Sequence, residues 1–170
     1  MTDGLDGLAG GVSFVVFLSF GFLILIFSKF LTPGLDETVI SQMTILSNIS
    51  FVASGALLGF LVFNCFPATI FMGDTGSMFL GGIVVALAYA VECPIILLPV
   101  GIVYVIEALS DVIQIASIKI RHKKVFKMAP IHHHFEMCGW NEKKIVAVFT
   151  FVSVIGCALG VIIMKYTVQM

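Results

Sequence analysis

A lone aspartate stands in the glycine- and hydroxyl-rich stretch FPATIFMGDTGSMFLGG, residues 66–82, between two long apolar runs. Gly73 and Gly76 allow the chain to turn tightly and to approach a ligand closely, while Asp74 supplies a carboxylate. If a helix begins here, its free N–H groups favour phosphate and the carboxylate favours Mg²⁺. The alternative is an ordinary helix cap, in which Asp74 satisfies the first turn of its own helix. The spacing alone leaves both interpretations open.

The first residues of the chain, TDGLDGLAGG, have the same character, with Asp3 and Asp6 each followed by a glycine. A separation of three residues places both carboxylates on one side of the segment if it is helical. They could then bind a metal ion, or accept hydrogen bonds from a base or a ribose. The competing interpretation is a polar turn that caps the membrane helix after it.

Three consecutive histidines lie in the stretch APIHHHFE, residues 129–136. His132, His133 and His134 cannot all face one metal ion from a regular helix or strand. Imidazoles beside a phosphate can donate hydrogen bonds, carry positive charge or transfer a proton near neutral pH. A solvated basic loop with incidental histidines is the alternative. A transition-metal site is disfavoured because no further well-placed ligand completes it.

A polar stripe follows one helix face of the apolar segment 95–119. Ionisable side chains within a membrane span face the protein interior and are candidates for function. The stripe would then line a polar cleft, or it would join helices by hydrogen bonds. An ion path, as in a transporter, is disfavoured because the polar motifs gather at one face and not at the midplane. The stripe consists of Glu107, Ser110, Asp111, Gln114 and Ser117.

The whole chain is unusually apolar. Of its 170 residues, 59% are hydrophobic and only 11% are charged, whereas soluble domains carry about 25% charged residues. The mean hydropathy is +1.13. A soluble core could not hide this much apolar surface, so the composition predicts an integral membrane protein. The net charge of −1 gives no general attraction to nucleic acid, which we do not expect as a partner.

Uncharged windows locate five expected membrane helices, each near the roughly 20 residues that a bilayer requires. We expect an all-α, polytopic membrane helix bundle that forms a single membrane domain over residues 1–170. The expected helices cover residues 8–28, 44–64, 76–91, 95–119 and 145–165.

Five spans would place the two ends of the chain on opposite sides of the membrane. Seven of the nine lysines and arginines fall in or beside the segment 119–144, which the positive-inside rule assigns to the cytoplasm. Alternation of the helices then places the N-terminal turn and the Asp74 turn on the same side. The polar motifs are therefore expected to meet at the cytoplasmic face of the bundle.

Together, the stretches TDGLDGLAGG, NCFPATIFMGDTGSMFLGG and MAPIHHHFEMCGWNEKKIV resemble the cytoplasmic motifs of the phospho-N-acetylmuramoyl-pentapeptide transferases. These are polytopic, Mg²⁺-dependent enzymes of the polyprenyl-phosphate N-acetylhexosamine-1-phosphate transferase superfamily, and they make the first lipid-linked intermediate of peptidoglycan. The complete PIHHHFE run is similar to the muramoyl-pentapeptide branch, not to the GlcNAc branch. The resemblance extends over nearly the whole chain, in order and with matching spacing.

The resemblance implies which residues take part in the chemistry. Asp74 would be the metal ligand, and Mg²⁺ is the implied cofactor. Asp3 would be a polar active-site residue. His132 and His133 would lie near the diphosphate and the sugar, and we place them with Asp74 and Asp3 in the catalytic group.

The resemblance also implies a binding site for the nucleotide sugar. Asp6 and Phe71 would contact the uracil, while Asn64, Gln114 and His134 would contact other parts of the same substrate. The implied substrates are UDP-MurNAc-pentapeptide and undecaprenyl phosphate, and the implied products are lipid I and UMP. The expected location is the inner (cytoplasmic) membrane of a bacterium, in contact with membrane lipid.

The sequence departs from the family at Asp111, where an apolar residue is expected, and at Asn141, where proline is common. The family has about ten spans and an earlier Asp-Asp motif, whereas this chain contains no such pair and corresponds to the last five spans. We therefore expect the N-terminal half of the enzyme as a partner and no activity from this chain alone. A second copy of the chain is a further candidate partner. The alternatives are a UDP-GlcNAc:polyprenyl-phosphate GlcNAc-1-phosphate transferase and a non-catalytic membrane subunit.

Overall fold

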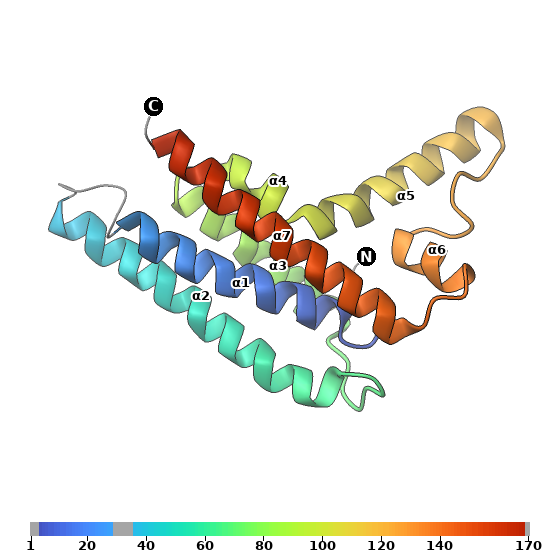
Figure 1. Ribbon diagram of the computed structural model, residues 1–170, viewed down its shortest axis with the longest axis horizontal. Helices are drawn as coiled ribbons and strands as arrows, with labels where there is room; N and C mark the ends of the chain where they lie inside the picture. The colour runs from blue at the N-terminus through green and yellow to red at the C-terminus, as the bar shows by residue number, and fades with distance from the viewer. Residues whose placement is uncertain (1–3, 29–35, 169–170) are drawn as a thin grey trace.

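The computed structural model describes residues 4–28 and 36–168, and the regular structure within these ranges is entirely helical (Figure 1). This confirms the expected all-α membrane bundle. Asp3 lies outside the described residues. The helices are α1 (Leu8–Ile26), α2 (Glu37–Asn64), α3 (Gly73–Ala90), the short 3-10 helix η2 (Pro94–Ile96), α4 (Leu97–Val100), α5 (Ile102–Arg121), α6 (Ile131–Met137) and α7 (Glu142–Val168).

Four of the described helices, α1, α2, α3 and α7, are long and apolar enough to cross a membrane. The expected span 95–119 is not one straight helix, because Pro94–Val100 and α5 meet at an angle of 83°. Pro99 and Gly101 stand at this break. A proline lacks the N–H that a continuous helix requires, and a β-carbon at residue 101 would lie 2.7 Å from the Leu97 carbonyl oxygen. The prediction of one continuous helix here was therefore wrong, although the bent pair together is long and apolar enough to be a fifth span.

Helix α1 forms the centre of the bundle. In its most apolar window 67% of the residues are buried, and it packs against α2, α3 and α7. At Gly21 the absence of a side chain lets the Phe51 ring of α2 come within 2.7 Å of where a β-carbon would stand. Ser47 on α2 donates a hydrogen bond to the Gly21 carbonyl oxygen at 2.9 Å. Small residues permit this close approach, which is typical of helix pairs in membranes.

The remaining helices are covered far less. Only 22% of the corresponding window of α2 and 17% of that of α3 are buried, and many large apolar side chains on them are exposed. In a membrane protein such surfaces face lipid tails or neighbouring helices.

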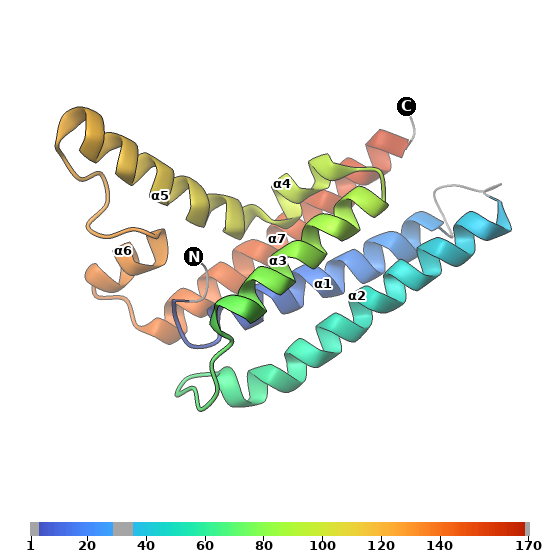
Figure 2. The same ribbon diagram turned by 180° about the vertical axis from the view of Figure 1, so that it is seen from behind.

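The polar motifs gather at one end of the bundle. Figures 1 and 2 place the start of α1, the loop between α2 and α3, and α6 at that end, while the C-terminal end of α7 lies at the other. Helix α5 diverges from the other helices, and the segment after it turns back to bring α6 towards the start of α7. The bend at Gly101 and this return segment therefore position the histidines.

Candidate active site

The turn of residues 4–7 is tied to other segments through Asp6. The Asp6 N–H donates a hydrogen bond to Glu142 Oε1 at the start of α7, at 2.8 Å. One Asp6 carboxylate oxygen accepts a hydrogen bond from the Ala68 N–H at 2.9 Å. Asp6 is neither helical nor a cap of α1, whose N-cap is Gly7 with a φ of 79°. Residues 4–7 thus form a turn before α1, and the helical condition for placing Asp3 and Asp6 on one side is not met by these residues.

Asn64, at the end of α2, joins this turn to the following loop. Its side chain is only 4% exposed. Its Oδ1 accepts a hydrogen bond from the Gly7 N–H at 3.1 Å, and its Nδ2 donates one to the Ile70 carbonyl oxygen at 2.9 Å. A carboxamide is suited to this position because it both accepts and donates. Asn64 therefore holds the 4–7 turn and the loop after α2 together. Its direct contact with a nucleotide stays a prediction.

The side chains of Phe71 and Asp74 are both exposed, just before and within the first turn of α3. The Phe71 side chain is 72% exposed, so its ring faces are open for stacking. Helix α3 begins at Gly73, with Asp74 exposed in its first turn and no side-chain hydrogen bond that caps the helix. Within the described ranges, the Asp74 carboxylate makes no hydrogen bond or ion pair. The interpretation of Asp74 as an ordinary cap was therefore wrong.

The described part of the chain holds no group of three His, Cys, Asp or Glu side chains arranged for a metal ion. At the start of α3 it holds an exposed carboxylate, that of Asp74, beside free N–H groups of the helix. Mg²⁺ is commonly bound by one or two carboxylates, with substrate phosphates and water completing its coordination. Among the described residues, Asp74 fits Mg²⁺ on those terms, and its binding of the ion stays a prediction.

The first two histidines of α6 differ sharply. His132 is fully buried, and its Nδ1 lies 2.7 Å from Glu107 Oε2 on α5. His133 is 27% exposed and pairs through Nδ1 with Glu136 at 2.5 Å. The interpretation of this stretch as a solvated loop with incidental histidines therefore fails for His132.

His134 and Gln114 both fasten the segment that leads to α6. His134 Nδ1 accepts a hydrogen bond from the Lys127 N–H at 3.1 Å. Gln114 Oε1 accepts from the N–H groups of Val125 and Phe126, at 3.1 and 2.9 Å, and Gln114 Nε2 donates to the Phe126 carbonyl oxygen at 3.0 Å. Both side chains are thus engaged in hydrogen bonds within the chain. Their contacts with the nucleotide sugar stay predictions.

The polar stripe of α5 thus holds its own following segment. Besides Glu107 and Gln114, Ser110 contributes by accepting a hydrogen bond from the Ile131 N–H at 3.0 Å. Of the two alternatives for the stripe, this supports hydrogen-bonded attachment rather than a cleft lining. Asp111 is half-buried and makes no hydrogen bond with the residues that the structure describes.

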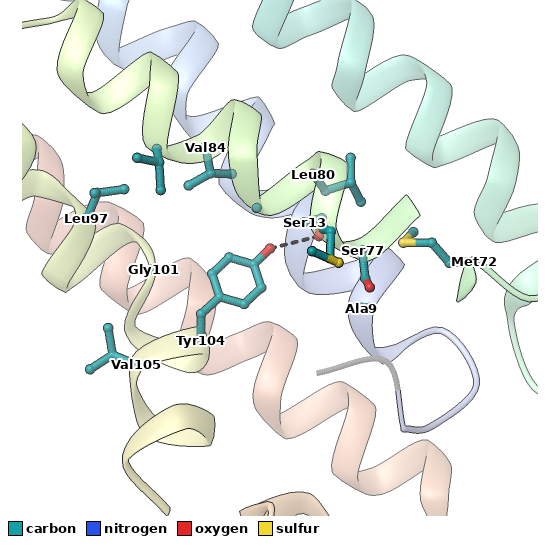
Figure 3. Close-up of a pocket in the computed structure, with 13 residues that line it drawn as sticks. Ala9, Ser13, Met72, Ser77, Leu80, Val84, Leu97, Gly101, Tyr104 and Val105 are labelled. Atoms are coloured by element: carbon teal, nitrogen blue, oxygen red, sulfur yellow. Dashed lines mark hydrogen bonds between the residues drawn. The ribbon is translucent and has the colours of Figure 1, made fainter. Parts of the chain in front are cut away.

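An apolar cavity of about 410 Å³ lies between α1, α3 and the bent α4–α5 span (Figure 3). Ser77, three residues after Asp74, lines it together with Met72. The only polar contact drawn between the lining residues of Figure 3 joins the hydroxyls of Ser13 and Tyr104 at 2.8 Å. The cavity therefore offers an apolar chain a place beside the exposed aspartate.

The sequence did not single out Glu142. It falls in the first turn of α7 and accepts the Asp6 N–H across a separation of 136 residues. The WNEKK stretch contains no pattern that predicts so distant a partner. Glu107 was visible as a member of the stripe, but its pairing with His132 was not.

The family described as glycosyl transferase family 4 matches residues 1–92. That range contains the N-terminal turn, Asn64, Phe71 and Asp74, and the chain belongs to this family. Curated relatives include the phospho-N-acetylmuramoyl-pentapeptide-transferases of Acetivibrio thermocellus, 48% identical over 160 residues, and of Clostridium novyi, 44% identical over 160 residues. The resemblance inferred from the motifs is confirmed.

These alignments cover 94% of the chain but only 44% and 45% of the two relatives. A relative from Clostridium botulinum with the same name is 47% identical, with 95% of the chain and 46% of the relative covered. The chain thus spans less than half the length of the curated relatives it matches. Its correspondence to their last five spans stays a prediction.

Proposed function

We propose that the chain forms part of a phospho-N-acetylmuramoyl-pentapeptide transferase. The complete enzyme transfers phospho-MurNAc-pentapeptide from UDP-MurNAc-pentapeptide to undecaprenyl phosphate at the cytoplasmic face of a bacterial inner membrane. The products are lipid I, used in peptidoglycan synthesis, and UMP. One observation carries the proposal: the Asp6 turn, Phe71, the free Asp74 and the histidine helix gather at one end of an apolar bundle. The names of the relatives support it.

The reaction is a phosphoryl transfer. An oxygen of the lipid phosphate attacks the sugar-proximal phosphorus of the nucleotide sugar, and the bond from that phosphorus to the UMP oxygen breaks. Catalysis of this class rests on positioning and on charge neutralisation. Asp74 would hold Mg²⁺, which would supply neutralisation of the diphosphate charge.

The side chains of this chain position the nucleotide sugar. The exposed Phe71 ring stacks on the uracil, and the Asp6 carboxylate, which accepts only the Ala68 N–H among the described residues, retains capacity for a donor of the base. The half-exposed His133 can donate a hydrogen bond to the diphosphate. The lipid chain occupies the apolar cavity between α1, α3 and α5.

The proposal requires a partner. The chain spans under half of its relatives, so we expect the remaining half to supply the further carboxylates of the site, including any base for the lipid phosphate. We therefore propose that this chain is inactive by itself and active when it is joined by that half.

The test follows UMP release in membranes that contain the chain alone, or the chain with the remaining part of a relative such as the Clostridium novyi enzyme. UDP-MurNAc-pentapeptide, undecaprenyl phosphate and Mg²⁺ are supplied, with UDP-GlcNAc as the matched donor control. We expect Mg²⁺-dependent release only with both parts and only from the muramoyl donor, and its loss in Asp74→Asn.

Activity from the chain alone would overturn the requirement for a second half. Release from UDP-GlcNAc in place of the muramoyl donor would identify the GlcNAc-1-phosphate branch. Silence in both preparations, with the bundle correctly folded, would favour a non-catalytic membrane subunit.

A further inference from the structure

Two ionisable side chains are sealed together beneath the N-terminal turn. Glu107 on α5 and His132 on α6 are both 0% exposed, and His132 Nδ1 lies 2.7 Å from Glu107 Oε2. Burial of such groups is costly unless they are hydrogen-bonded to one another. The contact therefore fixes α6 against α5 at one defined point.

Each member of the Glu107–His132 pair has one polar atom that makes no hydrogen bond with the described residues. Within the part of the chain that the structure describes, Glu107 Oε1 and His132 Nε2 are buried without a hydrogen-bond partner. Buried polar atoms are nearly always paired, and exceptions call for an explanation. An ionised Glu107 can only accept, so Nδ1 of His132 carries the hydrogen that it receives. In a neutral ring, Nε2 is then left as a defined acceptor.

The free nitrogen points at the turn that carries Asp6. A β-carbon at Gly4 would overlap His132 Nε2 and would lie 3.1 and 3.3 Å from the ring carbons Cε1 and Cδ2. The ring could not retreat, because it is fully buried and held by Glu107. The backbone at Gly4 therefore rests directly on the edge of the imidazole.

On the basis of the proposed function, we propose that Glu107 is a positioning residue for the nucleotide-sugar site. It fixes the orientation of His132, and the edge of that ring supports the 4–7 turn, which holds Asp6 where the uracil binds. His132 acts from beneath the turn, whereas the half-exposed His133 is the histidine open to the substrate. The two neighbouring histidines thus have different tasks.

A first experiment measures the geometry without using activity. Membranes that contain the chain are treated with diethyl pyrocarbonate, and modification of each histidine is followed by peptide mass spectrometry. We expect His132 to react at least about tenfold more slowly than His133, because a buried ring reacts only through local opening. We expect this protection to be lost in Glu107→Ala and in Gly4→Ala, and kept in Glu107→Gln and Asp111→Ala.

The matched control is Asp111→Ala, which removes a carboxylate from the next turn of the same helix without touching the pair. Equal reactivity of His132 and His133 in the unmodified chain would overturn the proposal. Protection that survives in Glu107→Ala would overturn it as well. The measurement on the unmodified chain holds even if a variant fails to fold.

A second experiment tests the positioning in the two-part preparation that releases UMP. We expect Glu107→Ala to raise KM for the nucleotide sugar about tenfold with a smaller change in kcat, since lost positioning of a bound substrate appears mainly in binding. Glu107→Gln should largely restore KM. A fall in kcat with unchanged KM would contradict the proposal. If no preparation releases UMP, the proposed function fails, and the modification experiment still decides whether Glu107 positions His132 and the turn.

Discussion

Two aspartate-containing turns lie at the same end of the bundle, and the described residues supply hydrogen-bond partners for the aspartate of only one of them. At the Asp6 turn, backbone N–H groups and carboxylate meet partners on α2, α7 and the following loop. At the Asp74 turn the aspartate is exposed, and a β-carbon at Gly73 would meet nothing within 4 Å.

The two turns differ in what holds their side chains: hydrogen bonds within the chain fix the Asp6 turn, whereas the Asp74 carboxylate makes none with the described residues. Contacts within the chain hold the Asp6 turn in place, which would lower the ordering cost of binding the proposed nucleotide. The Asp74 carboxylate has no hydrogen-bond or ion-pair partner among the described residues, so in the proposed function its ligands would come from substrate, metal ion and the remaining half. Changes at Asp74 should therefore alter catalysis alone, while changes around Asp6 should alter stability and binding together.

The largest effect is expected for Asp74→Asn. Loss of the proposed metal ligand removes several kcal/mol of charge stabilisation, and the rate of UMP release should fall about a thousandfold or more. The unfolding temperature should stay unchanged, because the carboxylate contacts no other described residue. Initial rates and thermal unfolding in detergent measure the two effects. A clear loss of stability would show that Asp74 has a structural role after all.

Asn64→Leu should be the most damaging change at the Asp6 turn. It would leave the buried Gly7 N–H without its partner, at a cost of roughly 1–3 kcal/mol, and the Ile70 carbonyl oxygen, in a half-buried contact, at a smaller cost. We expect a lower unfolding temperature and a higher KM. Asn64→Asp is the comparison variant: it can still accept from the Gly7 N–H, but it loses the donor to Ile70 and places a carboxyl oxygen beside the Ile70 carbonyl oxygen at a position that is only 4% exposed. Unchanged stability and KM in Asn64→Leu would contradict the role assigned to Asn64.

Glu142→Ala should have an intermediate effect. Asp6 would lose the acceptor of its N–H, at a cost of about 1 kcal/mol in a half-buried position. Glu37→Ala is the matched control, since Glu37 also stands in the first turn of a long helix but is exposed and accepts no hydrogen bond from Asp6. Thermal unfolding compares the two variants. A larger loss from Glu37→Ala would contradict the assigned role of Glu142.

An effect on stability of similar size is expected for alanine at the two turn glycines. Gly7 and Gly73 have φ values of 79° and 68°, so alanine at either costs about 1–2 kcal/mol in backbone conformation. At Gly7 the nearest atoms to an added β-carbon lie at 3.6 Å or more, so no clash adds to this cost. Chemical or thermal unfolding should give similar losses at both positions. A much larger loss at Gly7 would show that the Asp6 turn tolerates no added atom.

The sequence was a good guide to what depends on local composition. The apolar windows indicated the spans, although α2 begins at Glu37 and not at residue 44. The uncharged run already started after Glu37, but the length of a bilayer sets only a minimum for a membrane helix, and polar residues can continue it beyond that length. The gathering of the motifs at one end of the bundle followed from counting spans. The bend at Gly101 was missed even though Pro99 stands beside it, since prolines also occur within membrane helices that stay continuous.

The contacts within the site could not be read from the sequence. His132 and His133 are adjacent and identical in type, yet one is sealed and the other half-exposed, because α6 turns one inward and the other outward. The Asp6 and Glu142 pair joins residues 136 positions apart. Such pairs depend on how helices pack, which no local spacing records.

The most direct test of the contrast between the two turns is cation binding, with Mn²⁺ as a paramagnetic substitute for Mg²⁺. Its binding is measured by electron paramagnetic resonance to the chain alone, to the two-part preparation, and to both with Asp74→Asn. We predict weak binding to the chain alone, tighter binding with the second part, and loss of that tighter binding in the variant. Tight binding to the chain alone that persists in Asp74→Asn would contradict the account.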